Sequence, residues 1–267
     1  MKSLSRIFGL SGFLFIAVLL SGCYTVPETG RRSFTMLPLG TEIALGQQAF
    51  EEIRRSEKIS ENAEYNARLQ RVGDRIAKVA TPDLPSADWE FIVFENEAIN
   101  AFALPGGKIG FFTGMMELAD SDELVAVVMG HEVAHVTARH GNQRVSQALA
   151  LMAVGIGVQA AVSDRSQETQ LAVMIAYGAG TTLGLVLPHS RRNESEADEI
   201  GLYYMARAGY DPRYAPRFWQ KMEAEAKGGS IPEFLSTHPS HGRRIRDLEQ
   251  AMPRALQYYH RATQANQ

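Results

Sequence analysis

The sequence predicts a mainly helical α+β fold in which one small sheet edges a cleft. Three observations support this prediction. Apolar residues recur at helical spacing in several segments, residues 89–94 and 100–112 carry the patterns of a strand and a hairpin, and a strongly apolar helix follows them. The 267 residues, 45% hydrophobic and 21% charged, suit one globular domain with a targeting segment. The formal net charge of -3 gives no reason to expect nucleic acid as a partner.

The N-terminus is typical of an export signal. Two basic residues precede an apolar run that is shorter than the about 20 residues of a membrane span. The run ends in Leu20-Ser21-Gly22-Cys23, which resembles the bacterial lipobox. We therefore expect a signal peptide over 1–22, a lipid anchor on Cys23 and a location at the periplasmic face of a bacterial envelope. Tyr24 favours the outer membrane, and the alternative is an ordinary signal peptide with an incidental cysteine.

The rest of the chain divides into three predicted parts. Residues 23–40 are rich in proline, glycine and threonine, which predicts an extended tether. One domain is expected over 41–255, and a short C-terminal tail over 256–267.

The domain begins with two predicted helices and a strand. The first helix covers 41–57, where Thr41 can act as its N-cap. Apolar residues at alternating steps of four and three over 65–79 predict the second helix, which ends at the prolines of 81–85. The β-branched and aromatic run from Trp89 to Phe94 predicts the strand.

A hairpin and a buried helix are predicted next. Two short apolar runs flank Pro105-Gly106-Gly107, a pattern typical of a hairpin. Ser121 followed by two acidic residues predicts the start of a helix, and Gly141 predicts its end after His140. Because apolar residues cover most of the circumference of this helix, we expect it to be buried.

Two apolar stretches, 148–162 and 171–187, leave two structures open. Each is at or below the lower length of a transmembrane helix, and internal glycines weaken both as independent helices. We favour a buried helical pair or a plug over the site, and the alternative is a hairpin that contacts a membrane or a second copy. Asn193 is then expected to cap a helix over 194–208, and a last helix is expected over 239–252.

His131-Glu132-Val133-Ala134-His135 places two histidines four residues apart on one face of the predicted helix. Both imidazoles can therefore reach one metal ion, at about 2.0–2.1 Å each for zinc. Glu132 can reach a metal-bound water and take its proton during attack on a carbonyl. The alternative is a pair of histidines with ordinary partners. It is disfavoured because burying these three side chains in an apolar helix without a purpose is costly.

Zinc requires a third protein ligand and keeps its fourth position for water. Glu194 and Asp198 are four residues apart on a predicted helix, so their side chains share a face. Glu194 can bind the metal, and Asp198 can accept the free N–H of a ligand histidine. Glu196 points elsewhere on that helix and is rejected. Without the H-E-x-x-H motif, we would interpret these acids as complementing the dipole at the start of a helix. With the motif present, metal binding becomes the favoured interpretation.

H-E-x-x-H followed by E-x-x-x-D resembles the HtpX, BepA and CAAX-prenyl-protease family of gluzincins. Residues 100–107 are similar to the strand that precedes the active-site helix of that family. Ser236-Thr237-His238-Pro239, with Arg244 further on, is similar to its downstream His-Pro segment. The Thr-Gly-Arg-Arg run near residue 30 resembles bacterial relatives of the mitochondrial stress-activated inner-membrane protease. Together these similarities cover about residues 25–250.

The resemblance implies a zincin-like metallopeptidase fold with one Zn²⁺ per chain. It implies the metal ligands His131, His135 and Glu194, with Glu132 as general base and Asp198 as a residue that orients a ligand or handles protons.

The same resemblance implies that His238 and Arg244 lie near the metal, where they can stabilise an oxyanion. In some relatives this histidine instead occupies the open zinc position and keeps the enzyme latent. Without the resemblance, His238 would be interpreted as an ordinary loop histidine. Of the remaining histidines, His241 lacks the proline that follows His238, and His140, His189 and His260 are assigned to structure or solvent.

The hairpin before the motif helix is a candidate substrate site. In zinc peptidases with this helix, a substrate adds as an extra strand to an exposed sheet edge. The candidate substrate-binding residues are Asn100, Ala101, Phe102 and Ala103. Backbone pairing there would make selectivity depend on whether a polypeptide is unfolded. The alternative is a purely structural hairpin.

The sequence therefore predicts a zinc-dependent endopeptidase that cleaves unfolded or misassembled envelope proteins. One alternative is a non-catalytic chaperone or assembly factor that retains the zinc fold, which the intact Glu132 disfavours. Another is a zinc hydrolase of a non-peptide amide, which the shape of the cleft would discriminate. The expected partners are polypeptides and, through Cys23, a membrane, and homo-oligomerisation is left open.

Overall fold

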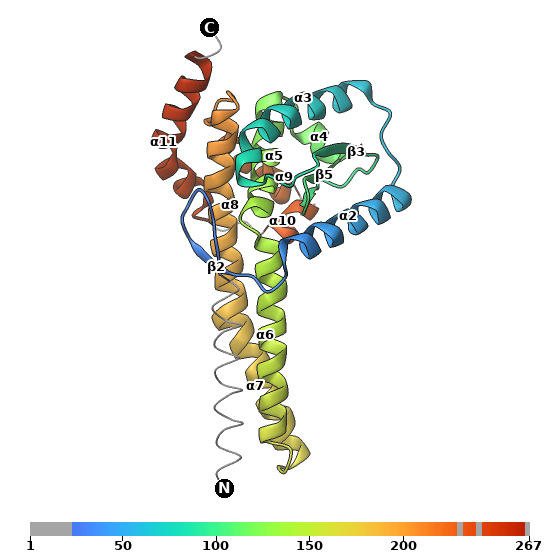
Figure 1. Cartoon of the computed structure of the whole chain (residues 1–267), viewed down its shortest axis with the longest axis vertical. Helices are drawn as coiled ribbons and strands as arrows, with labels where there is room; N and C mark the ends of the chain where they lie inside the picture. Colours follow the sequence, from blue (N-terminus) through green and yellow to red (C-terminus); the bar gives the residue numbers. More distant parts are fainter. Residues whose placement is uncertain (1–22, 229–231, 239–241, 265–267) are drawn as a thin grey trace.

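The computed structural model describes residues 23–228, 232–238 and 242–264 (Figure 1). The predicted signal peptide, 1–22, lies outside the described residues, as does Pro239. Helices make up most of the described chain, and two small sheets complete it. The predicted mainly helical α+β class is therefore confirmed. One long pair of helices projects from the body that contains the sheets (Figure 1).

Three strands form the sheet beside the central helix. β3 (Glu90–Phe94) pairs in parallel with β5 (Lys108–Phe112), and β4 (Ala101–Leu104) pairs antiparallel with β5. The order is β3-β5-β4, so β4 is an edge among the described strands. Gly106 and Gly107 have φ of 93° and 87° in the turn between β4 and β5, where side chains would be strained. The predicted strand and hairpin are confirmed.

α5 (Asp122–Thr137) crosses the centre of the body, and its residues from Leu124 onward are all buried. It packs between α3 (Ala63–Ala80) and α8 (Leu187–Arg207). Glycines permit the close crossing of α5 and α8, because a Cβ on Gly201 would lie 2.6 Å from the backbone nitrogen of His131. The prediction of a buried motif helix is confirmed.

The other helices cover this core. α2 (Leu39–Ser56) packs on the sheet, and α4 (Thr113–Leu118) follows β5 in the chain. α9 (Tyr214–Lys227) contacts α5, and α10 (Glu233–Thr237) comes next in the chain. α11 (Arg244–Gln264) lies along α8. The predicted C-terminal tail begins inside α11, so residues 256–264 are helical. This part of the prediction is wrong because one face of α11 continues to pack apolar side chains, Tyr258 and Tyr259, against the core past residue 255.

The predicted tether over 23–40 is also wrong. β1 (Cys23–Thr25) and β2 (Arg32–Phe34) form a hairpin that packs on the body. Val26 is fully buried in the core, and the Tyr24 hydroxyl donates to the carbonyl of Thr137 at 2.7 Å. The burial of Val26 and the hydrogen bond of Tyr24 fix a segment whose composition alone is typical of a loop.

Several helix boundaries differ from the prediction. α2 starts at Leu39, directly after Pro38, so Thr41 lies inside the helix and is not its N-cap. α5 ends at Thr137, and α6 (His140–Ala161) starts directly after Arg139, which has a φ of 54°. The break therefore uses a left-handed arginine, and Gly141 lies inside the next helix. Asn193 is not a cap, because α8 already starts at Leu187 and continues the preceding helical segment.

The predicted buried pair or plug is wrong. α6 and α7 (Gln167–Thr181) form the long pair that projects from the body, and a short π-helical segment, η2 (Thr182–Val186), connects α7 to α8 (Figure 1). Met152 and Ile156 on α6 are 61% and 66% exposed. Within the described residues, two helical stretches are long and apolar enough to cross a membrane, His140–Ala161 and Gln167–Arg207.

Candidate metal centre

α5 and α8 bring the two predicted metal motifs together. His131 and His135 lie one helical turn apart on α5, with their Nε2 atoms 3.1 Å from each other. Glu194 on α8 places Oε2 3.4 Å from Nε2 of His131 and Oε1 3.5 Å from Nε2 of His135. All three side chains are buried. The structure therefore gathers the three predicted ligands at one point.

The geometry of this cluster fits a small cation. Zinc in a tetrahedral site with bonds of about 2.0–2.1 Å would hold its ligand atoms about 3.3 Å apart. The distances among the three side chains run from 3.1 to 3.5 Å. His131, His135, Glu194 and His238 each offer a donor atom within 4.8 Å of all the others. The residues present thus form a set that can hold a metal ion.

The charges around His131 favour the same conclusion. Its Nδ1 lies 2.9 Å from Oδ1 of Asp198, the arrangement predicted for this acid. Burial lowers the pKa of the His131 imidazole, but its hydrogen bonds to the Asp198 and Glu194 carboxylates outweigh burial and raise it to about 9. Two buried carboxylates therefore make the cluster favourable for positive charge.

Arg244 lies beside the cluster, as the resemblance implied. Its Nε and Nη2 each donate to Asp198 at 2.7 Å, and Nη1 lies 3.5 Å from Oε2 of Glu194. The guanidinium carbon lies 3.5 Å from the ring centre of Trp219, and the side chain is 1% exposed. Arg244 thus neutralises the Asp198 carboxylate and holds its Oδ1 in contact with Nδ1 of His131.

His238 reaches the same cluster from the end of α10. Its Nδ1 is 3.2 Å from Nε2 of His131 and 3.1 Å from Oε2 of Glu194. Its Nε2 is 3.3 Å from Oε1 of Glu132, and its ring stacks on Phe234. The imidazole therefore occupies the corner of the cluster that the three other donors leave open.

Glu132 points from α5 toward the strand edge. Burial raises the pKa of its carboxyl above the ordinary value, against the opposing charges of His238 and His131. The backbone of Ala103 on β4 faces this carboxylate and opposes the rise in its pKa. Its Oε1 is buried without a hydrogen-bond partner among the described residues. A carboxylate in this state is ready to accept a proton at the cluster.

The predicted substrate residues lie on and beside β4. The Asn100 side chain is already engaged, since it donates to Glu233 at 3.0 Å and accepts from the N–H of Ala101. Phe102 stacks on Phe94 across the sheet. Only the backbone of β4, next to Ala103 and the Glu132 carboxylate, therefore remains for a further strand.

His140 and Glu196 belong to the site, although the sequence interpretation set both aside. Nδ1 of His140 lies 2.9 Å from Nδ1 of His135, and its Nε2 lies 2.9 Å from Oε2 of Glu196. Arg31, from the β1–β2 hairpin, donates from Nε to Glu196 at 2.8 Å. Glu196 does point away from the metal ligands, as predicted, but it supports one of them through His140. A buried histidine five residues after the motif was the available signal.

This fold and donor set define a metallopeptidase of the H-E-x-x-H class. The chain matches the model of Peptidase family M48 over residues 63–252, and it belongs to that family.

Several characterised proteins are similar to this chain. It is 33% identical over 242 residues to the "Mitochondrial metalloendopeptidase OMA1" of Schizosaccharomyces pombe, which covers 86% of this chain and 66% of that protein. The protein of the same name from Arabidopsis thaliana is 38% identical over 191 residues, covering 71% of this chain and 37% of its own length. The "Beta-barrel assembly-enhancing protease" of Escherichia coli is 29% identical over 227 residues, with 84% and 46% covered. The chain thus spans from 37% to 66% of these relatives.

Proposed function

We propose that this metalloprotease is a zinc-dependent endopeptidase that cleaves unfolded or misassembled polypeptides in a bacterial envelope. The observation that carries the proposal is the convergence of His131, His135 and Glu194 around one point, beside a buried Glu132 carboxylate. A purely structural metal site would need the three ligands but would not need Glu132.

Each residue has a distinct part in the proposed reaction. His131, His135 and Glu194 would hold Zn²⁺, which when bound polarises a peptide carbonyl and lowers the pKa of water to about 7. Glu132 would accept the proton of the attacking water and deliver it to the leaving nitrogen. Its raised pKa suits a group that must hold this proton between the two steps.

A substrate would lie along β4. This strand pairs with β5 on one side and is an edge on the other, so an extended polypeptide can add to it through backbone hydrogen bonds. The contact of Glu132 with the backbone of Ala103 links that edge to the metal centre. Because Asn100 and Phe102 are engaged inside the body, side-chain selection there would be weak, as suits unfolded substrates.

His238 would act as a latch in this proposal. Its Nδ1 lies within 3.2 Å of His131 and Glu194, and its Nε2 faces Glu132, so the ring fills the space that a substrate carbonyl needs. The imidazole must therefore move before cleavage. Arg244 would hold Asp198, and through it the tautomer of His131 that presents Nε2 to the cluster.

The location is part of the proposal. The Escherichia coli relative carries β-barrel assembly in its name, which supports envelope proteins as substrates, and a lipid on Cys23 would hold this chain at the periplasmic face of the outer membrane. Mass spectrometry of the mature N-terminus tests the anchor directly, since an acylated cysteine as first residue is expected.

The Glu132→Gln variant tests the reaction. It should retain one zinc per chain and cleave casein about 10²–10⁴-fold more slowly than the parent, because the general base is lost. Glu123→Gln, on the same helix but at its start, is the matched control and should cleave at the parental rate. Equal cleavage by the Glu132 variant would refute the mechanism. A zinc-loaded parent that suppresses casein aggregation without cleaving it would instead support the chaperone alternative.

A further inference from the structure

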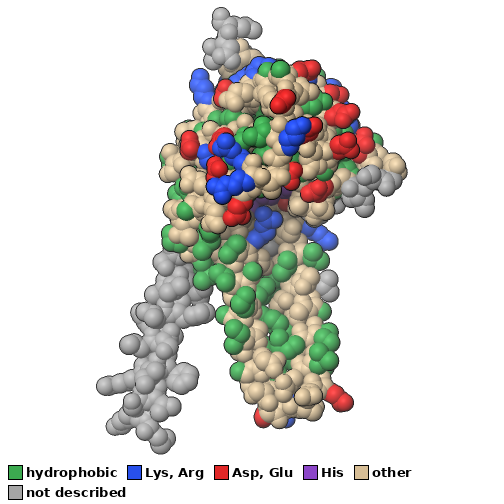
Figure 2. All heavy atoms as spheres, turned by 90° about the vertical axis from the view of Figure 1, so that its right-hand side faces the viewer, with side chains coloured by type: hydrophobic (Ala, Val, Ile, Leu, Met, Phe, Trp, Pro, Cys, Tyr) green, Lys and Arg blue, Asp and Glu red, His purple; other side chains and the backbone are tan. Residues whose placement is uncertain are grey.

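The pair of helices formed by α6 and α7 has no partner that covers it in the described part of the chain. Its exposed apolar side chains are Val145, Leu149, Met152, Val154 and Ile156 on α6 and Leu171 and Ile175 on α7, and Leu185, Val186 and Leu187 follow on η2 and at the start of α8. Figure 2 shows hydrophobic side chains along the projecting shaft, whereas most charged side chains on this face gather over the body and a few lie at the tip. A contiguous exposed apolar surface of this kind is unfavourable in water and marks a site that contacts another apolar surface.

The shaft is built as a self-contained unit. Gly155 lets the two helices approach, because a Cβ at that position would lie 3.2 Å from the Tyr177 ring. The Tyr177 hydroxyl donates to the backbone carbonyl of Leu151, and Gln159 donates to Gln170 near the tip. Close packing at a small residue and satisfied polar groups are the features that stabilise helix pairs in lipid.

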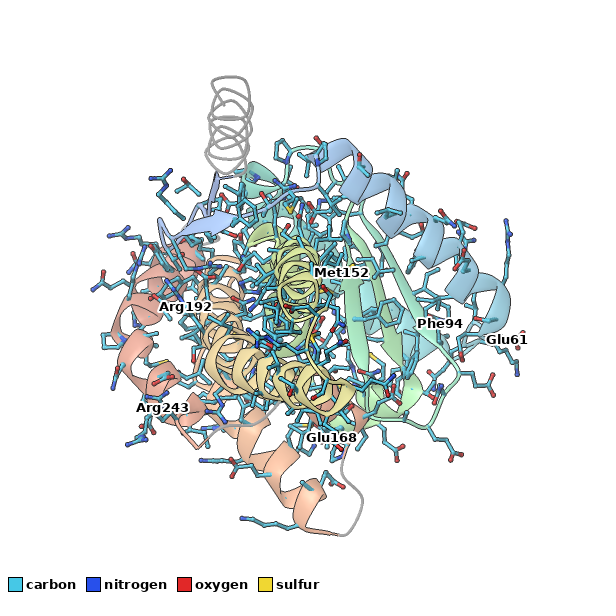
Figure 3. All side chains as sticks on the ribbon, turned by 90° about the horizontal axis from the view of Figure 1, so that it is seen from below. Glu61, Phe94, Met152, Glu168, Arg192 and Arg243 are labelled. Atoms are coloured by element: carbon cyan, nitrogen blue, oxygen red, sulfur yellow. The ribbon has the colours of Figure 1, made fainter. Side chains whose placement is uncertain are left out.

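The distribution of charge along the shaft has the pattern of a membrane segment. No Asp, Glu, Lys or Arg occurs over 145–163 or over 169–190. Exposed arginines stand at the base, Arg144 on α6 and Arg191 and Arg192 next to it on α8. Charged residues return at the tip around Glu168, which Figure 3 labels together with Met152 and Arg192.

The length of the apolar part of the shaft is close to the thickness of a bilayer. From Val145 to the end of α6 at Ala161 there are 17 residues, which at a rise of about 1.5 Å per residue span about 26 Å. The hydrocarbon core of a bilayer is about 30 Å thick. The arginines at the base would then lie among the headgroups on one side and the charged tip among those on the other.

We propose that the α6–α7 pair is inserted into the hydrocarbon core of a lipid bilayer, with its arginine base at the headgroups. A bilayer is favoured over a second copy because exposed apolar residues lie on both helices, whereas a dimer would cover one stripe. The position of Cys23 agrees: it pairs with Phe34 of β2, which lines a pocket at the base of the shaft with Leu151 and Leu185. His140, which contacts the metal cluster, lies five residues before Val145 on α6, so it would stand roughly 8 Å outside the start of the inserted segment.

The test measures the surroundings of single residues. The only cysteine is Cys23, so a Cys23→Ser background accepts one fluorescent probe at a chosen cysteine. Probes are placed on the shaft at Ile156, and on exposed apolar residues of the body at Leu45 and Ile59, which are 52% and 44% exposed and serve as matched controls. The full chain is reconstituted into vesicles of phosphatidylethanolamine and phosphatidylglycerol. Quenching by acyl-chain spin-labelled lipid and by aqueous iodide is then recorded.

The proposal expects the probe at Ile156 to be quenched several-fold more by the spin-labelled lipid than the probes on the body, and several-fold less by iodide. Iodide quenching equal to that at Ile59 would place the shaft in water and overturn the proposal. Protection from both quenchers would show a second copy of the chain on the shaft and would also overturn it. Neither result depends on zinc, on cleavage or on acylation, so the proposed function is tested separately.

Discussion

The chain of contacts behind His135 makes a quantitative prediction about metal affinity. Arg31 donates to Glu196, and Glu196 lies 2.9 Å from Nε2 of His140, so a carboxylate fixes the proton on that nitrogen. Nδ1 of His140 is then an acceptor, and Nδ1 of His135, at 2.9 Å, must donate to it. His135 is thereby left with a bare lone pair on Nε2, which faces the metal cluster.

Replacing Glu196 with glutamine keeps the shape but removes the charge that fixes these tautomers. The glutamine amide can also donate to His140, and the proton of His135 would then move to the nitrogen that faces the metal. Loss of a partner of this kind lowers metal affinity about 10–100-fold, or about 1.4–2.7 kcal/mol. We expect the zinc dissociation constant of Glu196→Gln to rise within this range.

Competition with a chromophoric chelator measures this constant. Glu199→Gln is the control, since Glu199 lies on the same helix but accepts from Tyr203 and has no hydrogen bond to His140 among the described residues. A thermal melt of each metal-free variant separates lost affinity from lost stability. If Glu196→Gln binds zinc within twofold of the parent while the melts agree, the tautomer argument is incorrect.

Three further predictions use other parts of the molecule. His238→Ala should retain zinc and cleave casein several-fold faster, because its ring fills the open corner of the cluster; slower cleavage would instead assign it to catalysis. Gly201→Ala should lower the free energy of unfolding by about 1–3 kcal/mol, since the added Cβ would meet the backbone of α5. The control Gly141→Ala, whose Cβ would have nothing within 4 Å, should not lower it. Equal melting temperatures for the two variants would contradict the prediction. Cys23→Ser should abolish incorporation of labelled fatty acid, and persistent labelling would exclude this residue as the acylation site.

The features that depend on short sequence separations were predictable. Residues four apart on one helix share a face wherever that helix lies, so the pair His131 and His135 followed directly from spacing. Pro105-Gly106-Gly107 likewise predicts its own turn, because the two glycines supply the positive φ that the turn requires. Glu194 was chosen because zinc needs a third ligand and because Glu194 and Asp198 share a helix face, and the family pattern then supported the choice, since no local rule brings α8 beside α5.

The wrong predictions concern segments whose burial depends on which other elements pack on them. Periodicity identified the apolar character of 148–162 and 171–187, but composition does not distinguish a buried helix from one that projects. The same limit applies to residues 23–40, where Val26 is buried by helices remote in sequence. The break at Arg139 lacks glycine or proline at the left-handed position, so it leaves no local signal. His140 gains its role only because that break turns it back toward His135.

The position of the shaft explains how two motifs so far apart in sequence form one site. α6 starts at His140, next to His135, and leads away from the cluster; α7 and η2 return along it and continue into α8, which carries Glu194. Figure 1 shows this path out of the body and back. η2 and α8 continue α7 without a break, so the position of α8 along α5 depends on how α7 packs on α6. The close contact between Gly130 of α5 and Gly201 of α8 then fixes that position. The segment between the motifs is therefore the element that sets the register of the metal ligands.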